Sequence, residues 1–458
     1  MPGTSVTMQG IPRRHYRAAL SWNDRYLALL AIVLLGYALM GKGFAYLGFP
    51  PLYVGEIAFL AGIVVFLRIG AFASVLTTLP AILLVALMAL VVARTLPYVG
   101  LYGIDALRDG VIVIYGGFAF ILVGLLLEDT RRINSILRYY RIMLAALPAL
   151  FAGLLVTKYW ADYIPWLFGP VPILDTGASM VGTHLAGTMV FALIGFRKVS
   201  VAWVCVWFAT LTLVCALNRG ATIAVVLPVV FAMLALGQFR LILNTVAAGV
   251  AILAVLFALE ATFGEYSEAR DSTDRPVSAH QIVENMKSII GQSGQQAEGT
   301  KQWRLNWWDI IINDTVHGDN FWTGRGFGRN LAYEDGFAGT GDRRGPRNPT
   351  RSPHSAHMTM LARTGIPGLV LWLLVLVSWF WMLMRAILTA RARGHEQWAG
   401  LFLFIGCYAA AIVINASFDV AIEGPVQGIW FWCLFGFGLG SVMVYRAQSF
   451  NELLRKDA

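Results

Sequence analysis

The sequence predicts an all-α, polytopic transmembrane helical bundle, because the chain is apolar, poor in charge and built from long uncharged blocks. Of its 458 residues, 58% are hydrophobic and only 13% are charged, whereas a soluble protein carries about 25% charged residues. Residues 71–93 and 241–261 each form a run of about 20 residues with almost no charge. As helices, such runs are long enough to cross roughly 30 Å of hydrocarbon.

The apolar blocks predict about 12 membrane spans, with one large hydrophilic loop between the ninth and the tenth. The ends of the blocks place the spans at residues 26–41, 51–67, 71–93, 111–127, 142–160, 183–196, 199–217, 221–237, 241–261, 355–384, 399–415 and 426–445.

The net charge of +9 indicates membrane topology and not nucleic-acid binding, because most basic residues outside the large loop lie in short connections between apolar blocks. With the N-terminus inside, the cytoplasmic segments hold eighteen basic residues: Arg13, Arg14, Arg17, Arg25, Arg68, Arg131, Arg132, Arg138, Arg141, Arg197, Lys198, Arg240, Arg385, Arg391, Arg393, Arg446, Arg455 and Lys456. The short outer segments hold only five: Lys42, Arg94, Arg108, Lys158 and Arg219. This asymmetry predicts that both termini are cytoplasmic.

The predicted topology divides the chain into four parts. We expect spans 1–9 within residues 1–261, the large outer loop at 262–353, spans 10–12 within 354–445 and a cytoplasmic tail at 446–458. No small-residue cleavage site follows the first apolar run, so we expect an uncleaved first helix and no signal peptide. All four cysteines fall inside apolar blocks, so no disulfide framework is expected in the loop.

The large loop is too long to be a simple connector. Asn306–Thr315 is expected to form a short helix that follows Trp303 and Arg304. The indole rings of this segment, those of Trp303, Trp307 and Trp308, suit the membrane–water boundary. The glycine-rich segment Phe321–Asn330 predicts a turn.

Two arginines are candidates for binding an anion. Arg219 lies between two apolar runs that leave almost no room for a loop. Its guanidinium either extends to the lipid headgroups or faces the protein interior, where it would grip a phosphate through two parallel hydrogen bonds. Arg304 is either an ordinary loop residue or an anion ligand, and in the second case the N-terminus of the expected helix would add a favourable field.

His354 and His357 lie where the loop re-enters the membrane. Their spacing places both imidazoles on one helical face, but no third ligand lies nearby in the sequence, so a zinc site is disfavoured. A histidine at a membrane boundary suits a general base; the alternative is a hydrogen-bonded interfacial residue. Glycines at 324, 326 and 328 resemble part of a phosphate loop but lack its lysine pattern and a preceding strand. The acids Glu56, Asp419 and Glu423 lie in or near apolar blocks, which suggests a role or a partner.

Several of these segments occur in a recognisable order. Asn218-Arg219-Gly220 begins a span, Arg304 with Trp307-Trp308 precedes the glycine-rich turn, and His354 lies eleven residues before Gly365-Ile366-Pro367-Gly368-Leu369. Together with Asp105–Asp109 and Phe418-Asp419, this order resembles the O-antigen ligase and Wzy-type polysaccharide polymerase superfamily over roughly residues 50–445. Asn218 stands where that family usually has a small hydroxyl residue, and Ser355 where it most often has Asn.

The resemblance implies a GT-C-like membrane glycosyltransferase in the bacterial inner membrane, with its active site facing the periplasm. Such an enzyme moves a glycan from an undecaprenyl-diphosphate donor to an acceptor sugar, with inversion and without a metal or another cofactor. By the resemblance, His354 is the general base and Arg219 and Arg304 bind the diphosphate. Supporting roles fall to the residues His357, Arg351, Ser355 and Asp419.

The sequence leaves the acceptor open, because a ligase and a polymerase share the donor chemistry. The acceptor is lipid A-core in the first case and another glycan repeat in the second, and other proteins of polysaccharide assembly would be the partners. A lipid-linked oligosaccharide flippase is the alternative from another class, since it shares the span count and the need for cationic groups. Transporters more often show two similar halves and no large unpaired loop.

Overall fold

The computed structural model describes residues 21–456 apart from 168, 264–276, 290, 292–294 and 339–349. The regular elements of the described part are helices, apart from an antiparallel hairpin of two two-residue strands, in which Gly48 pairs with Tyr53, and an isolated bridge between Gly41 and Asp175. The first elements are α1 (Trp22–Met40), α2 (Lys42–Ala45), β1 (Gly48–Phe49), β2 (Leu52–Tyr53), α3 (Val54–Ile69), α4 (Phe72–Val75) and α5 (Leu79–Tyr102).

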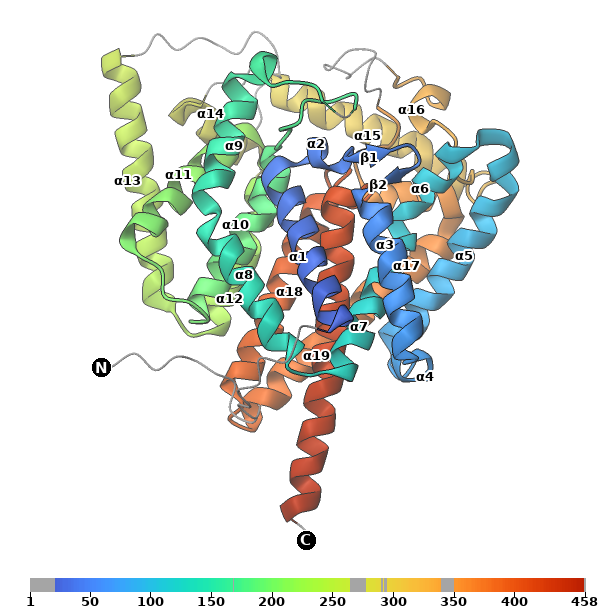
Figure 1. Ribbon diagram of the computed structural model, residues 1–458. Helices are drawn as coiled ribbons and strands as arrows, with labels where there is room; N and C mark the ends of the chain where they lie inside the picture. The colour runs from blue at the N-terminus through green and yellow to red at the C-terminus, as the bar shows by residue number, and fades with distance from the viewer. Residues whose placement is uncertain are drawn as a thin grey trace.

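The middle of the chain forms α6 (Ile104–Ile114), α7 (Gly117–Glu128), α8 (Arg132–Ala145), α9 (Leu147–Tyr159), the 3-10 turn η1 (Ala161–Tyr163), α10 (Ala178–Leu193), α11 (Val201–Leu217), α12 (Arg219–Ala235) and α13 (Phe239–Phe263). The large loop contributes α14 (Ala279–Ile289), α15 (Gln295–Val316) and α16 (Leu331–Glu334), which lie at one end of the bundle (Figure 1). The last helices are α17 (Ala356–Ala392), α18 (Glu396–Ala416) and α19 (Pro425–Lys456).

Apart from 71–93, each predicted span falls on one of these helices or on a bent helix pair. The span expected at 71–93 covers α4 and only the first part of α5, which starts at Leu79 and continues to Tyr102. Not every helix is long enough to be counted as a span. Six helices are long and apolar enough to cross a membrane, and up to eight spans result if the bent pairs α6–α7 and α8–α9 each count as one. Helices α10, α11 and α12 are apolar but shorter. The chain is therefore a multi-pass helical membrane protein by helix length and composition, while the count of about 12 and the GT-C-like architecture remain predictions.

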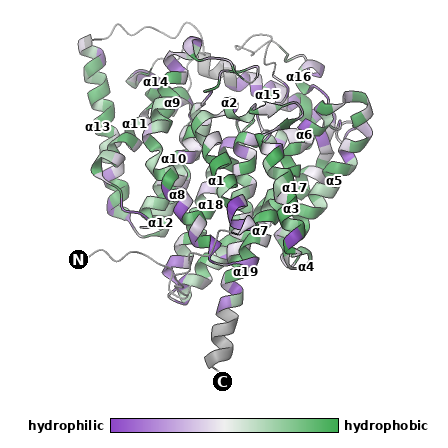
Figure 2. Ribbon diagram, viewed as in Figure 1, coloured by the Kyte–Doolittle hydropathy of each residue, from purple (hydrophilic) through white to green (hydrophobic). Residues whose placement is uncertain are grey.

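The centre of the bundle is formed by α18 and α19. In the most apolar 18-residue stretch of each helix, 78% and 94% of the residues are buried. Helix α19 packs against α7, and α18 packs against α10, α12 and α17. Hydrophobic residues cover most of the long helices in Figure 2. This arrangement buries aromatic residues of α19 such as Trp432 completely, and it holds the ends of α12, α17 and α18 in fixed positions.

Helix α17 is broken near its beginning, although the sequence predicted one span over 355–384. Gly365 has φ 69° and ψ −170°, a left-handed conformation that glycine adopts without a steric penalty. The N–H of Ile366 donates to the Phe321 carbonyl, and Pro367 supplies no N–H of its own. A short helix that carries the histidine segment therefore precedes the long apolar part.

Helix α15 starts at Gln295, and not at Asn306 as the sequence predicted. The expectation that Arg304 stands at a helix N-terminus is therefore wrong, and the helix dipole does not act at this position. Trp307 is 0% exposed and packs with Ile311 and Leu331 in a small core of the loop. The interfacial position expected for Trp307 is also wrong, because the loop is folded and needs its own hydrophobic centre.

Candidate functional site

The predicted site residues are carried by four separate elements. Asn218 caps α12 through its side chain, which accepts from the Ala221 N–H, and Arg219 is the first residue of that helix. Arg304 lies within α15. The other site residues lie in the turn before α17, in the first turn of α17 (His357) and in the connection between α18 and α19.

His354 has a left-handed backbone with φ 52°, which is uncommon for a residue with a Cβ. The next residue, Ser355, caps α17 by accepting from the Met358 N–H. The His354 ring packs edge-on against Trp303, with 5.8 Å between the ring centres. Non-glycine residues in this conformation gather at functional sites, so the backbone supports the sequence-based interest in His354.

Asp419 is the acidic neighbour of His354. Its Oδ1 lies 3.8 Å from Nδ1 of His354, and both side chains are about one-third exposed or less. Burial raises the pKa of Asp419, but the His354 imidazole, the Ser179 hydroxyl and the backbone N–H of Val420 together hold it well below its usual range. Asp419 is thus a stable carboxylate that can balance a positive charge on the imidazole.

Arg304 contributes a cation to the same place. Its Nε is buried and has no hydrogen-bond partner among the described residues. Burial lowers the pKa of Arg304, the Asp419 carboxylate raises it, and the nearby Arg219 guanidinium lowers it further. Two arginines therefore share a partly desolvated region, in which an unpaired donor is costly until a ligand accepts from it.

Arg219 is held in place from the large loop. Its Nη1 donates to the hydroxyl of Ser288 on α14. Helix α14 is also tied to α11 through Asn285, whose amide donates to the Cys215 and Ala216 carbonyls. The loop helices and the end of α12 therefore position the guanidinium together.

His357 has both ring nitrogens engaged. Nδ1 accepts from the indole N–H of Trp372 at 3.0 Å, so Nε2 carries the proton and donates to the Ser417 hydroxyl at 3.1 Å. The Ser417 hydroxyl in turn donates a hydrogen bond to the Val413 carbonyl. The ring thus ties α17 to the end of α18, just before Asp419. The described residues contain no group of three or more His, Cys, Asp or Glu side chains arranged to hold a metal.

Arg351 contacts acids of α6. It pairs with Asp105 at 3.2 Å and with Asp109 at 3.6 Å, and it donates to the Gly328 carbonyl. Asp109 also pairs with the buried Arg363 at 2.9 Å. The segment 105–109 therefore fastens the glycine-rich turn and the start of α17 to α6.

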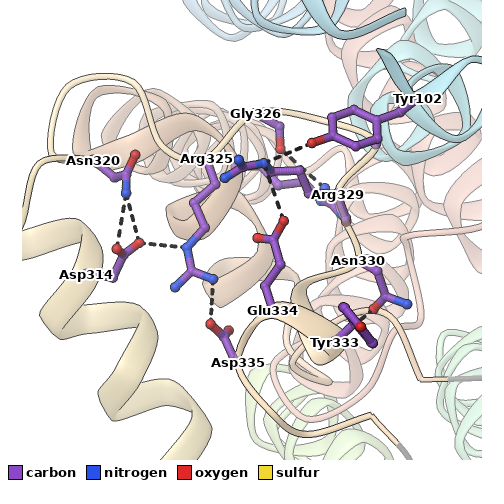
Figure 3. Close-up of polar contacts among 12 residues, drawn as sticks. Tyr102, Asp314, Asn320, Arg325, Gly326, Arg329, Asn330, Tyr333, Glu334 and Asp335 are labelled. Atoms are coloured by element: carbon purple, nitrogen blue, oxygen red, sulfur yellow. Dashed lines mark hydrogen bonds and ion pairs between the residues drawn. The ribbon is translucent and has the colours of Figure 1, made fainter.

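The glycine-rich turn is a structural insertion into the break of α17. The N–H groups of Arg325 and Gly326 donate to the carbonyls of residues 362 and 363, and the N–H of Gly328 donates to Asp109. Arg325 lies between Asp314 and Asp335 (Figure 3), at 2.6 Å from each. These N–H groups are occupied by protein oxygens, so the turn does not form a phosphate cradle.

Three further contacts around His354 were not foreseen. Thr359 donates to Glu423 at 2.9 Å, and Ser352 also bonds to that carboxylate. The indole N–H of Trp308 donates to the Pro353 carbonyl at 2.8 Å. The acid Glu423 had been noticed in the sequence, but its partners lie more than sixty positions away and gave no local signal.

The fold and the site together define a class: a multi-pass helical membrane protein with a polar site at the ends of its helices, beside a folded hydrophilic loop. Residues 204–373 match the family model Wzy_C, described as O-antigen ligase. This match confirms the resemblance over a region that includes Arg219, Arg304 and His354 and ends before Asp419. A comparison with curated proteins finds no match.

Proposed function

We propose that this protein is a membrane glycosyltransferase that moves a glycan from an undecaprenyl-diphosphate donor to an acceptor sugar. The observation that supports this most directly is the buried, unpartnered Nε of Arg304 close to the charge of Arg219. A diphosphate supplies acceptor oxygens and negative charge, and arginines bind such groups through paired hydrogen bonds. The family match supports lipid-linked glycans as the substrate class.

In the proposed mechanism, His354 takes a proton from the acceptor hydroxyl. The hydroxyl oxygen attacks the anomeric carbon from the face opposite the diphosphate, a new C–O bond forms, and the bond from that carbon to the diphosphate oxygen breaks. The electron pair leaves on the diphosphate, whose negative charge Arg219 and Arg304 balance. Asp419 lies 3.8 Å from the His354 ring and stabilises the imidazolium formed by the proton transfer.

This mechanism needs no metal ion, since the two guanidiniums take over charge neutralisation. Holding both substrates in line would supply much of the remaining rate enhancement. The asymmetry of basic residues favours the periplasmic side of a bacterial inner membrane for this reaction. The acceptor is either lipid A-core or a further glycan repeat, and partners in a polysaccharide assembly complex would supply the substrates.

The test is glycan transfer by the purified protein in nanodiscs, with a lipid-diphosphate glycan and candidate acceptors. We expect His354→Ala to lower single-turnover transfer by roughly 10²–10⁴-fold while donor binding stays near that of the wild type. His317→Ala is a matched control, because His317 is exposed in the same loop. A protein that moves the lipid-linked glycan across a bilayer and forms no glycosidic bond would support the flippase alternative instead.

A further inference from the structure

The connection between α18 and α19 is short and carries two acidic residues next to the candidate site, Asp419 and Glu423. It starts after Ala416, where α18 ends, and stops at Pro425, where α19 begins. Its internal hydrogen bonds are local. The Val420 N–H donates to the Asp419 carboxylate at 2.8 Å, and the Glu423 N–H donates to the Val420 carbonyl. The path of this connection therefore depends strongly on how its two ends are held.

A chain of buried polar side chains joins those two ends. Asn415, in the last turn of α18, donates through its amide to the side-chain oxygen of Gln427 at 3.1 Å. Gln427, in the first turn of α19, donates through Nε2 to the Thr183 hydroxyl at 2.6 Å. Thr183 belongs to α10 and donates to the Met180 carbonyl at 2.7 Å. The side chains of Asn415, Gln427 and Thr183 form this polar chain, and they are 1%, 3% and 0% exposed.

The hydrogen bonds leave one orientation for the central amide. Because the Thr183 hydroxyl donates to its own helix, it acts as the acceptor for Gln427, and Nε2 must point toward it. Oε1 then faces Asn415, whose amide supplies the donor. A buried polar group that loses its partner costs free energy, and the cost is larger within a membrane-spanning bundle, where water is scarce. The polar chain therefore fixes the positions of α10, α18 and α19 relative to one another.

The same helices hold Asp419. Ser179, one helical turn before Thr183 on α10, hydrogen-bonds to the Asp419 carboxylate. Asp419 lies four residues after Asn415, and its Oδ1 lies 3.8 Å from Nδ1 of His354. The polar chain thus connects the helix that carries the hydroxyl partner of Asp419 with both helices that flank Asp419 in the sequence.

We propose that Gln427 is a positioning residue, which joins α18 and α19 to α10 so that Asp419 stays beside His354. The inference rests on the proposed function, in which Asp419 balances the charge of the His354 ring. Gln427 contacts no substrate in this proposal and acts through Asp419. Without the polar chain, the connection shifts relative to α10, and a displacement of about 1 Å at a reacting group lowers a rate by roughly 100-fold.

Gln427→Met tests this role, because methionine keeps an unbranched side chain of similar length and removes both hydrogen bonds. We expect kcat for glycan transfer to fall by roughly 10–100-fold, while donor KM stays near its wild-type value. Thr188→Val is the matched control and should leave kcat unchanged. Thr188 is also fully buried in α10, but its hydroxyl donates to the Leu185 carbonyl of its own helix.

Asp419→Asn distinguishes positioning from general packing. This variant alone should lower kcat, and the addition of Gln427→Met should lower kcat little further, because the residue through which Gln427 acts has already lost its charge. The effects of two residues that act independently multiply instead. Multiplied effects, or a wild-type kcat in Gln427→Met, would overturn the proposal.

Hydrogen–deuterium exchange provides a measurement that does not depend on glycan transfer. The backbone N–H groups of Phe418 and Glu423 donate to nearby carbonyls, so their exchange rates report how firmly the connection is held. Gln427→Met should speed exchange over residues 417–424, and Thr188→Val should not. Unchanged exchange in Gln427→Met would overturn the inference. If exchange rises as expected while the wild-type protein transfers no glycan, the proposed function fails and the role of Gln427 in holding the connection stands.

Discussion

Glu423 offers a test of how the His354 backbone is held. Its carboxylate accepts a hydrogen bond from the Thr359 hydroxyl and is hydrogen-bonded to the Ser352 side chain. One side chain therefore contacts the backbone segments on both sides of His354. The left-handed φ of 52° at His354 costs about 1–3 kcal/mol. The turn keeps this conformation only if such contacts stabilise it by at least as much.

The size of the effect follows from these contacts. Two hydrogen bonds to a charged group contribute about 3–6 kcal/mol, and water replaces part of this because Glu423 is only half-buried. If Glu423→Ala destabilises the active turn by about 2 kcal/mol, kcat falls about 30-fold. Donor KM should stay near its wild-type value, because the arginines lie on other helices.

The assay is steady-state and single-turnover glycan transfer in nanodiscs, with thermal unfolding recorded for each variant. Glu423→Gln should restore part of kcat, since the amide oxygen still accepts one hydrogen bond. Glu396→Ala, at the opposite end of α18, is the control and should leave both parameters unchanged. The reasoning is refuted if Glu423→Ala keeps full kcat, or if its only effect is a weaker affinity for the donor.

Other outcomes follow from the same contacts. Arg304→Ala should weaken donor binding by about 2–5 kcal/mol, with partial rescue by Lys, which lacks the paired donors; equal affinity in a titration would contradict this. His357→Ala should lower the melting temperature and reduce transfer far less than loss of His354 does, because its ring nitrogens bond to Trp and Ser side chains. Transfer should persist in excess EDTA, and activity restored only by added Mg²⁺ or Mn²⁺ would exclude the metal-free mechanism. For topology, a cysteine at Ala338 should react with an impermeant maleimide in spheroplasts, whereas one at Thr389 should not; the reverse labelling would invert the orientation.

The sequence predicted the helices well wherever hydrophobicity alone determines them. The apolar runs that gave the spans 26–41 and 399–415 became α1 and α18, with ends only a few residues away. The sequence-based prediction failed where contacts with distant segments determine the local structure. The break at Gly365 depends on hydrogen bonds with the glycine-rich turn. Trp307 is buried in the hydrophobic core of the loop, which no local sequence pattern predicts.

The site was predictable as a set of residue types but not as a geometry. Arginine and histidine at span ends are conspicuous because charges there are costly, so Arg219 and His354 could be selected from sequence. Asp419 could also be selected, but which of these residues lie next to one another could not be predicted. Asp419 lies beside His354 across 65 residues of chain, and only the packing of α17 on α18 brings the two together.

The arginines of the loop region divide into two kinds by their partners, and this division supports a ligand role for one of them. Arg325 lies 2.6 Å from each of two aspartates, and Arg363 lies 2.9 Å from Asp109. These cations are neutralised within the protein and hold the turn against α17. Arg304 instead has a buried donor without a hydrogen-bond partner among the described residues, and a second arginine close enough to lower its pKa. Such an unfavourable buried charge is expected where a bound anion neutralises it. A diphosphate would neutralise the charge of Arg304, and the same interaction would make the diphosphate a better leaving group.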